Sequence, residues 1–231
     1  MSTFIIQGGS KLQGEIAVSG AKNMATKVLA ASLLSDETMH VSNVPEVEDV
    51  KRLLEILSSL GVRVERVAEG EYKLTPENLD IDRLDYELVG KFRASILLLA
   101  PLLVRFKKVR FPQPGGCTIG KRPIDLFIHG LRALNVTVKE GDTYNEFVAK
   151  QLVGNRVVFT KISVTGTETM MLAAVFAQGK TTLVNVAQEP EVVALAEYLN
   201  SQGAQIEGAG SSTMTITGVE KNRRRAGESH T

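Results

Sequence analysis

The chain has 231 residues, of which 43% are hydrophobic and 23% charged, a composition typical of a soluble globular protein. Its formal net charge of +1 provides no global field that would attract nucleic acid or an anionic membrane. One cysteine excludes an intramolecular disulfide and fits a reducing compartment, and three widely separated histidines argue against a structural zinc site. No signal-peptide pattern is present, and the longest nearly apolar stretch, 94–104, falls short of the ~20 residues that span a bilayer. We therefore expect a cytoplasmic protein that does not enter a membrane.

In chain order, residues 1–21 come first and predict two short strands, at 4–7 and 15–19, joined by a glycine-containing turn. One pattern then occurs three times. It begins with a strongly apolar helix, expected at 24–34, 94–104 and 170–177. A short strand follows, expected at 38–44, 108–111 and 181–186, and then a proline at or just before an amphipathic helix.

Each amphipathic helix ends at a residue that tolerates the left-handed conformation, namely Gly61, Asn135 and Gly203. These turn residues lie 74 and 68 residues apart, and each leads directly into a strand. A strand or hairpin closes each unit, at 71–75, 146–150 and 213–217. The pattern therefore predicts three αβαβ-like units.

One helix of each unit is apolar nearly all round, which places it inside, and the other is amphipathic, which places it toward water. We expect an α/β fold in which three units pack around shared buried helices, an inside-out arrangement. An ordinary α/β sandwich with chance internal similarity is the alternative. We expect the domain to span residues 22–220, because residues 221–231 have no periodicity and no large apolar residue and predict a disordered polar tail.

Residues 88–124 contain no Asp or Glu but eight Lys and Arg residues, which predicts a local field that favours anions. A solvated basic face that pairs with acids elsewhere in the fold is the alternative. Nucleic-acid binding would call for interleaved aromatic side chains, and this stretch has only Phe92, Phe106 and Phe111. Small phosphorylated ligands fit better.

The glycine-rich loop 114–120 lies inside this basic stretch and contains the lone cysteine, Cys117. Its glycines allow a ligand to approach the backbone closely. Lys121 and Arg122 follow shortly, and nearby positive charge lowers a thiol pKa and raises its reactivity. The loop is a candidate reactive site, and an unreactive free cysteine is the alternative.

Lys22 and Asn23 precede the first apolar helix, where a charge, an amide and the helix dipole can together bind a phosphate. A helix start with Lys22 in solvent is the alternative. His129 falls on an amphipathic helix, and we expect a solvent or packing role for it.

Five motifs occur in order: Ser-Gly-Ala-Lys-Asn at 19–23, Phe-Arg-Ala-Ser at 92–95, Pro-Gly-Gly-Cys-Thr-Ile-Gly at 114–120, Arg-Pro-Ile-Asp-Leu at 122–126 and Glu-Pro-Glu-Val-Val at 189–193. Together they resemble the UDP-N-acetylglucosamine 1-carboxyvinyltransferases of the enolpyruvyl transferase family, over about residues 1–220. The resemblance implies two domains, each an inside-out α/β barrel of three repeats, with the active site between them. It implies transfer of the enolpyruvyl group of phosphoenolpyruvate to the 3-hydroxyl of UDP-N-acetylglucosamine with release of phosphate, the first committed step of peptidoglycan synthesis. No metal or organic cofactor is implied.

The resemblance also assigns roles to residues. Cys117 is similar to the general acid that protonates the methylene carbon of phosphoenolpyruvate, and Lys22, Asn23 and Arg122 correspond to residues that bind this substrate. The residues that correspond to UDP-sugar contacts are Arg93, Arg122, Pro123, Ile124, Asp125, Leu126, Lys161, Ile162, Ser163 and Val164.

The sequence departs from the family in lacking the second domain. In the family, that domain supplies the aspartate that deprotonates the sugar hydroxyl, and residues 1–21 pack against it. We expect a truncated chain or one half of a split enzyme, with exposed apolar surface in residues 1–21 and little turnover alone. One alternative is a non-catalytic product or a UDP-sugar-binding half that needs a partner chain. Another, an RNA-processing protein on a related three-repeat fold, is disfavoured by the lack of interleaved aromatics and by the cysteine loop.

Overall fold

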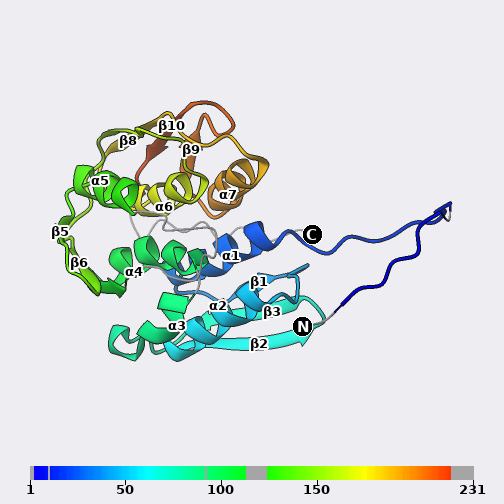
Figure 1. Cartoon of the computed structure of the whole chain (residues 1–231). Helices are drawn as coiled ribbons and strands as arrows, with labels where there is room; N and C mark the ends of the chain where they lie inside the picture. The colour runs from blue at the N-terminus through cyan, green and yellow to red at the C-terminus, as the bar shows by residue number, and fades with distance from the viewer. Residues whose placement is uncertain (1–2, 10, 92, 113–123, 220–231) are drawn as a thin grey trace.

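The fold consists of three units in which helix, strand, helix and two further strands follow one another (Figure 1). A computed structural model describes residues 3–9, 11–91, 93–112 and 124–219. The first unit comprises α1 (Lys22–Ala31), η1 (Ser32–Leu34), β1 (Met39–Val41), α2 (Glu48–Ser59), β2 (Val62–Ala68) and β3 (Glu71–Pro76). Two short helices, η2 (Ile81–Arg83) and α3 (Tyr86–Lys91), lead into the second unit.

The second unit comprises η3 (Arg93–Leu98), α4 (Leu99–Phe106), β4 (Lys108–Pro112), α5 (Asp125–Ala133), β5 (Thr137–Lys139) and β6 (Tyr144–Val148). The third comprises β7 (Arg156–Val158), α6 (Val164–Ala174), β8 (Lys180–Val184), α7 (Pro190–Ser201), β9 (Gln205–Glu207) and β10 (Thr213–Thr217). The three predicted repeats are therefore confirmed, each with a closing hairpin.

The three sheets share one topology. Their strand orders are β1-β3-β2, β4-β6-β5 and β7-β8-β10-β9, so that the last strand of each unit lies between the other two and runs antiparallel to both. The third sheet gains one strand, β7, which pairs parallel with β8 and was not predicted. A strand of three residues is too short to leave a periodic pattern of apolar residues in the sequence.

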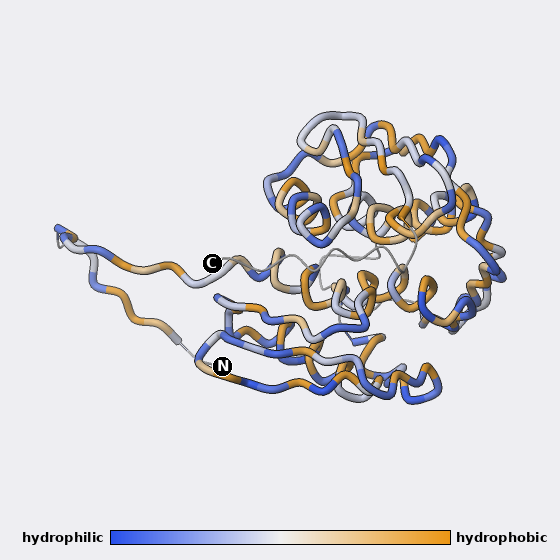
Figure 2. Tube along the Cα trace, turned by 180° about the vertical axis from the view of Figure 1, so that it is seen from behind, coloured by the Kyte–Doolittle hydropathy of each residue, from blue (hydrophilic) through white to orange (hydrophobic). Residues whose placement is uncertain are grey.

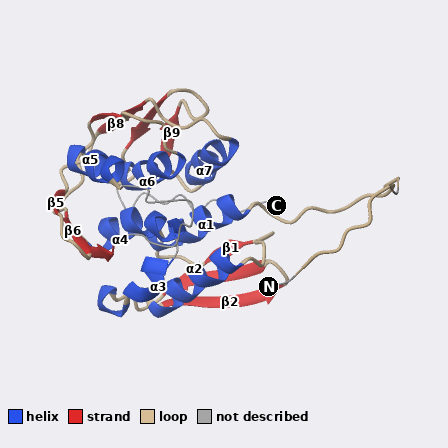
Figure 3. Ribbon diagram, viewed as in Figure 1, coloured by secondary structure: helices blue, strands red, loops and turns tan. Residues whose placement is uncertain are grey.

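The helices expected inside are the buried ones. Residues 25–31 of α1, 99–104 of α4 and 166–174 of α6 are all buried, whereas α2 buries one face only. Figure 3 shows these helices between sheets that lie at the periphery, and α4 packs on α6 while α1 packs on α7. Periodicity thus predicted which helix of each unit is internal.

The bounds of the inner helices differ from those expected. Residues 93–106 divide into the 3-10 helix η3 and α4, and Pro101 falls in the first turn of α4, where its missing amide costs no hydrogen bond. Helix α6 begins at Val164 instead of residue 170, because Ser163 caps it.

The predicted left-handed turns are confirmed at Gly61, Asn135 and Gly203, whose φ angles are 101°, 68° and 96°. Gly61 is also sterically required, since a Cβ there would lie 2.2 Å from the carbonyl oxygen of Asn78. These turns return the chain from each outer helix to its sheet.

The prediction of two strands within residues 1–21 is wrong for this chain, because residues 3–9 and 11–20 form no strand and project from the rest of the protein (Figure 1). A strand needs a neighbouring backbone, and no described segment provides one. Figure 2 shows hydrophobic stretches along this projecting N-terminal arm. Its large apolar side chains are 85–96% exposed; they are Phe4, Ile5, Ile6, Leu12, Ile16 and Val18. The expected exposed apolar surface is therefore present. The predicted polar tail, 221–231, lies outside the described residues.

Candidate functional site

Lys22 and Asn23 occupy the exposed first turn of α1, whose N-cap, Ala21, makes no side-chain cap. Lys22 Nζ lies 2.8 Å from Asp49 Oδ2 of α2, and Asn23 Nδ2 donates to Glu191 Oε1 of α7 at 3.3 Å. Lys22 is therefore paired with Asp49 and is also in solvent, since 47% of its side chain is exposed. The first turn of α1 meets the outer helices of the first and third units, although these are far apart in sequence.

Glu191 is poised as an anionic partner of Asn23. The pKa of its carboxyl lies below the ordinary value, first because its own backbone N–H donates to it, and further because of the Asn23 amide and the Lys27 charge. A proline was expected at or just before each amphipathic helix, and α7 does begin at Pro190, but the contact of Glu191 with Asn23 had no local sequence signal.

Lys27 and Glu168 form an ion pair between α1 and α6, with Lys27 Nζ 2.5 Å from Glu168 Oε1 and side chains only 4% and 1% exposed. Burial raises the pKa of Glu168 to about 7, against the opposing effects of the Lys27 hydrogen bond and charge. Sequence reasoning missed this pair. A signal existed, because a lysine and a glutamate within otherwise apolar inner helices are rarely buried without a partner.

The segment expected to hold the uridine diphosphate lies at the start of α6. Lys161 and Ile162 are exposed, and Ser163 accepts a hydrogen bond from the Gly166 N–H at 3.1 Å, which caps the helix. Val164 is the first helical residue. This is a second helix N-terminus among the predicted site residues, and such a terminus favours anions.

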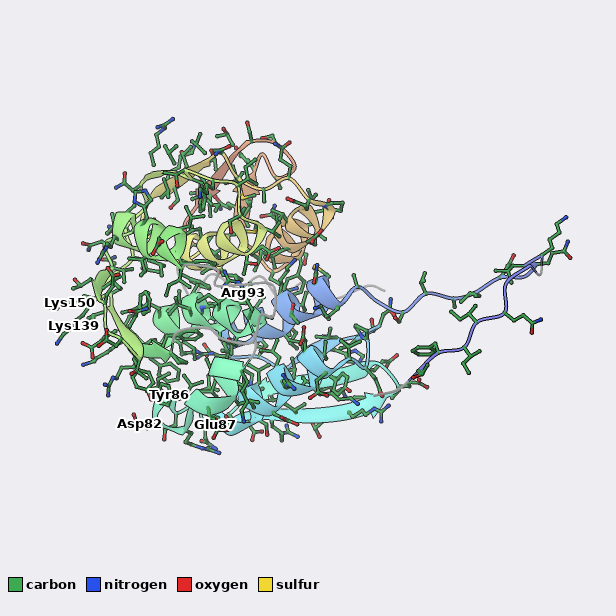
Figure 4. All side chains as sticks on the ribbon, viewed as in Figure 1. Asp82, Tyr86, Glu87, Arg93, Lys139 and Lys150 are labelled. Carbon is green, nitrogen blue, oxygen red and sulfur yellow. The ribbon has the colours of Figure 1, made fainter. Side chains whose placement is uncertain are left out.

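Arg93 begins η3, which packs against both α1 and α6. Figure 4 shows Arg93 in the centre of the protein, between α4 and α6. Ile124 is buried in the core as the N-cap of α5, Asp125 is exposed in its first turn, and Leu126 is half-buried. Cys117, Arg122 and Pro123 lie outside the described residues, as does the loop 114–120.

The basic stretch 88–124 does not act as a single cationic surface within the described residues. Lys91 pairs with Glu87 at 2.6 Å, Arg105 with Asp36, and Lys108 with Glu146 at 3.0 Å. The alternative of pairing with acids elsewhere holds for these cations. His129, on α5, is exposed as expected.

Two further features bear on ligand binding. A surface pocket of about 350 Å³ is lined by mixed charges that include Arg110, Lys139 and Glu146, and it contains no predicted site residue. Within the described ranges, no group of three or more His, Cys, Asp or Glu side chains is placed to hold a metal ion. In the same part of the chain, no helix is long and apolar enough to cross a membrane.

The chain is similar to known proteins over nearly its whole length. The family model for EPSP synthase (3-phosphoshikimate 1-carboxyvinyltransferase) matches residues 6–228. The UDP-N-acetylglucosamine 1-carboxyvinyltransferase of Gloeobacter violaceus is 46% identical over 94% of this chain and 47% of its own length. The enzyme of the same name from Pasteurella multocida is 46% identical over 96% of this chain and 52% of its own length. The chain thus spans about half the length of the curated relatives it matches.

The fold has a counterpart among solved structures. The enolpyruvyl transferase NikO from Streptomyces tendae superimposes with a TM-score of 0.78 at 23% identity, over 93% of this chain and 50% of that protein. An EPSP synthase from Acinetobacter baumannii superimposes with a TM-score of 0.73 at 20% identity, over 90% of this chain and 47% of that protein. This α/β domain therefore accounts for about half of those structures, and the chain belongs to the enolpyruvyl transferase family.

Proposed function

We propose that this chain provides one half of the active site of a UDP-N-acetylglucosamine 1-carboxyvinyltransferase, a cytoplasmic enzyme of peptidoglycan and cell-wall synthesis. The observation that carries the proposal is the 46% identity to enzymes of that name over 94–96% of this chain. The three units of residues 22–220 would form an inside-out α/β barrel, with α1, α4 and α6 as its inner helices.

The reaction joins O3 of the sugar to C2 of phosphoenolpyruvate while a proton is added to C3. Loss of phosphate from C2 and of a proton from C3 then restores the vinyl group. In this proposal Cys117 delivers the proton to C3, and Lys22, Asn23 and Arg122 hold the phosphate and carboxylate of phosphoenolpyruvate. Fixed cations beside these groups stabilise the charge that develops in the tetrahedral intermediate.

The geometry of the described residues is compatible with these roles. Lys22 is about half exposed and its partner Asp49 one-third exposed, so an incoming phosphate can compete for the ammonium at small cost. The start of α6, with Ser163 and Val164, would receive the diphosphate of the UDP-sugar, while Arg93, Ile124, Asp125, Leu126, Lys161 and Ile162 would line the remainder together with Arg122 and Pro123.

The activity would require a second domain, on the same polypeptide or on a separate chain, to supply the base for the sugar hydroxyl. The coverage of about half of each relative also favours a second candidate function, a UDP-sugar-binding half without turnover of its own. The two candidates differ in phosphate release, not in binding.

The test is a titration of the purified chain with UDP-N-acetylglucosamine and phosphoenolpyruvate, followed by a phosphate-release assay with both. We expect binding with little or no turnover, and Lys22→Ala is expected to weaken phosphoenolpyruvate binding about tenfold, whereas Lys51→Ala, a change at an exposed lysine on α2, leaves it unchanged. Robust turnover would eliminate the non-catalytic candidate. Absence of binding to either substrate would contradict the proposed function.

A further inference from the structure

The ion pair between Lys27 and Glu168 is distinct among the ion pairs of the described residues. Both of its side chains are less than 5% exposed, whereas every other pair there has at least one partner that is a third or more exposed. It joins the inner helix of the first unit to the inner helix of the third. Neither residue has a role in the proposed chemistry.

The pair lies one helical turn inside the proposed substrate-binding ends of both helices. Lys27 follows Asn23 by four residues on α1, and Glu168 follows Val164 by four residues on α6, so each charge shares a helix face with a proposed binding residue. The segment η3, which begins at Arg93, packs against the same two helices. The pair thus connects the segments on which three groups of proposed binding residues lie.

Stability alone does not account for a buried ion pair. Removing both charges from water costs about as much as their attraction returns, and well-packed apolar residues would serve the core at least as well. Glu189 and Glu191 add negative charge beside Glu168, which further disfavours its ionised form. An ion pair defines the distance and direction between two helices, whereas an apolar contact does not.

We propose that Lys27 and Glu168 are positioning residues, whose ion pair holds the first turns of α1 and α6 in the relative position that binds the two substrates. The ligand identities rest on the proposed function, but the positioning itself does not. Asn23 is positioned through α1, with its amide on Glu191, and Ser163 through α6.

The positioning depends on pH, because the pair exists only while Glu168 is ionised. The charged groups that act on Glu168 are Lys27 of α1, Glu191 in the first turn of α7 and Glu189 just before that helix. With a Glu168 pKa of about 7, the pair is complete above that pH and is lost as the pH falls through it. A purely apolar contact would show no such dependence.

The experiment measures amide hydrogen exchange of the full chain, as protection factors of the amides that close the first turns of α1 and α6. These are Ala25 N–H, which donates to the Ala21 carbonyl, and Thr167 N–H, which donates to the Ser163 carbonyl. The variants are Glu168→Gln, the apolar double variant Lys27→Met/Glu168→Leu, and a control, Asp36→Asn, which breaks the ion pair with Arg105 just beyond the opposite end of α1. We expect protection at both first turns to fall about fivefold or more in Glu168→Gln and in the double variant, and to stay unchanged in Asp36→Asn. Wild-type protection at these turns should change between pH 6 and pH 8, where Glu168 titrates, and the double variant should show no such change.

A double variant that unfolds like the wild type and keeps wild-type protection at both turns would overturn the proposal, because the pair would then be a replaceable core contact. The same variants are titrated with UDP-N-acetylglucosamine, and weakening of about fivefold is expected where protection is lost. If the wild type binds neither substrate, the proposed function fails, while the protection factors still decide whether the pair positions the helix ends.

Discussion

Charged side chains in the exposed first turns of the inner helices form pairs that solvent can reach, whereas those in the next turn form a buried pair. At the surface, Lys22 pairs with Asp49 and Asn23 with Glu191, in contacts that water can replace. One turn inside, Lys27 and Glu168 are almost fully buried and pair with each other. The outer pairs can therefore exchange partners with an anionic ligand, whereas the inner pair is committed to one arrangement.

The largest expected effect comes from breaking the inner pair on one side. Glu168→Leu leaves the Lys27 ammonium buried without a counter-charge and should lower the free energy of unfolding by about 3–5 kcal/mol. Urea unfolding at pH 8 measures it. The double variant Lys27→Met/Glu168→Leu removes both charges and should fall within about 1 kcal/mol of the wild type. A double variant as unstable as the single one would show that packing, and not charge, decides the stability here.

The next effect is the pH dependence of stability. Glu168 has a raised pKa of about 7 in the folded state against 4.5 when unfolded, so the folded state binds the proton more strongly. Glu168 therefore lowers the free energy of unfolding as the pH rises from about 4.5 to about 7, by up to about 3 kcal/mol, and adds no further change above that pH. The measured quantity is the wild-type stability minus that of Glu168→Gln at pH 5 and at pH 8. An equal difference at both pH values would mean that Glu168 does not titrate in this range.

Asn23→Ala tests an exposed contact and should matter less. The amide makes one hydrogen bond, to Glu191, in a solvent-accessible position, so its loss should cost about 1 kcal/mol or less of stability. The proposed function expects a separate, larger effect on phosphoenolpyruvate binding, which calorimetric titration measures. A destabilisation as large as that of Glu168→Leu would contradict the contrast between surface and interior.

The smallest effect is expected for Asp49→Asn, which removes the partner of Lys22. Both side chains are partly exposed, so stability should change by less than about 0.5 kcal/mol. Because the freed ammonium no longer has to leave a carboxylate, binding of phosphoenolpyruvate or inorganic phosphate should strengthen if Lys22 holds the phosphate. Unchanged phosphate affinity would argue against that role.

The sequence by itself determined the repeat architecture. Apolar residues all round a helix require burial, so 24–34, 94–104 and the C-terminal half of α6 identified the inner helices. Gly61, Asn135 and Gly203 identified the returns to the sheets, because a helix that stops in the left-handed conformation favours these residue types. Both signals depend only on residues that are neighbours in the sequence, so they can be recognised without the tertiary structure.

Only the tertiary structure decided which charges meet. Lys22 and Asp49 are 27 residues apart, and Asn23 and Glu191 are 168 apart, so no periodicity could have paired them. The same holds for Lys27 and Glu168, which belong to different units and meet because the units pack around shared inner helices. The N-terminal residues 3–20 show the same dependence, since two strands were predicted there, at 4–7 and 15–19, and a strand needs a partner backbone to form. Helix burial is encoded within a segment, whereas ion pairs and strands depend on what the rest of the fold brings beside it.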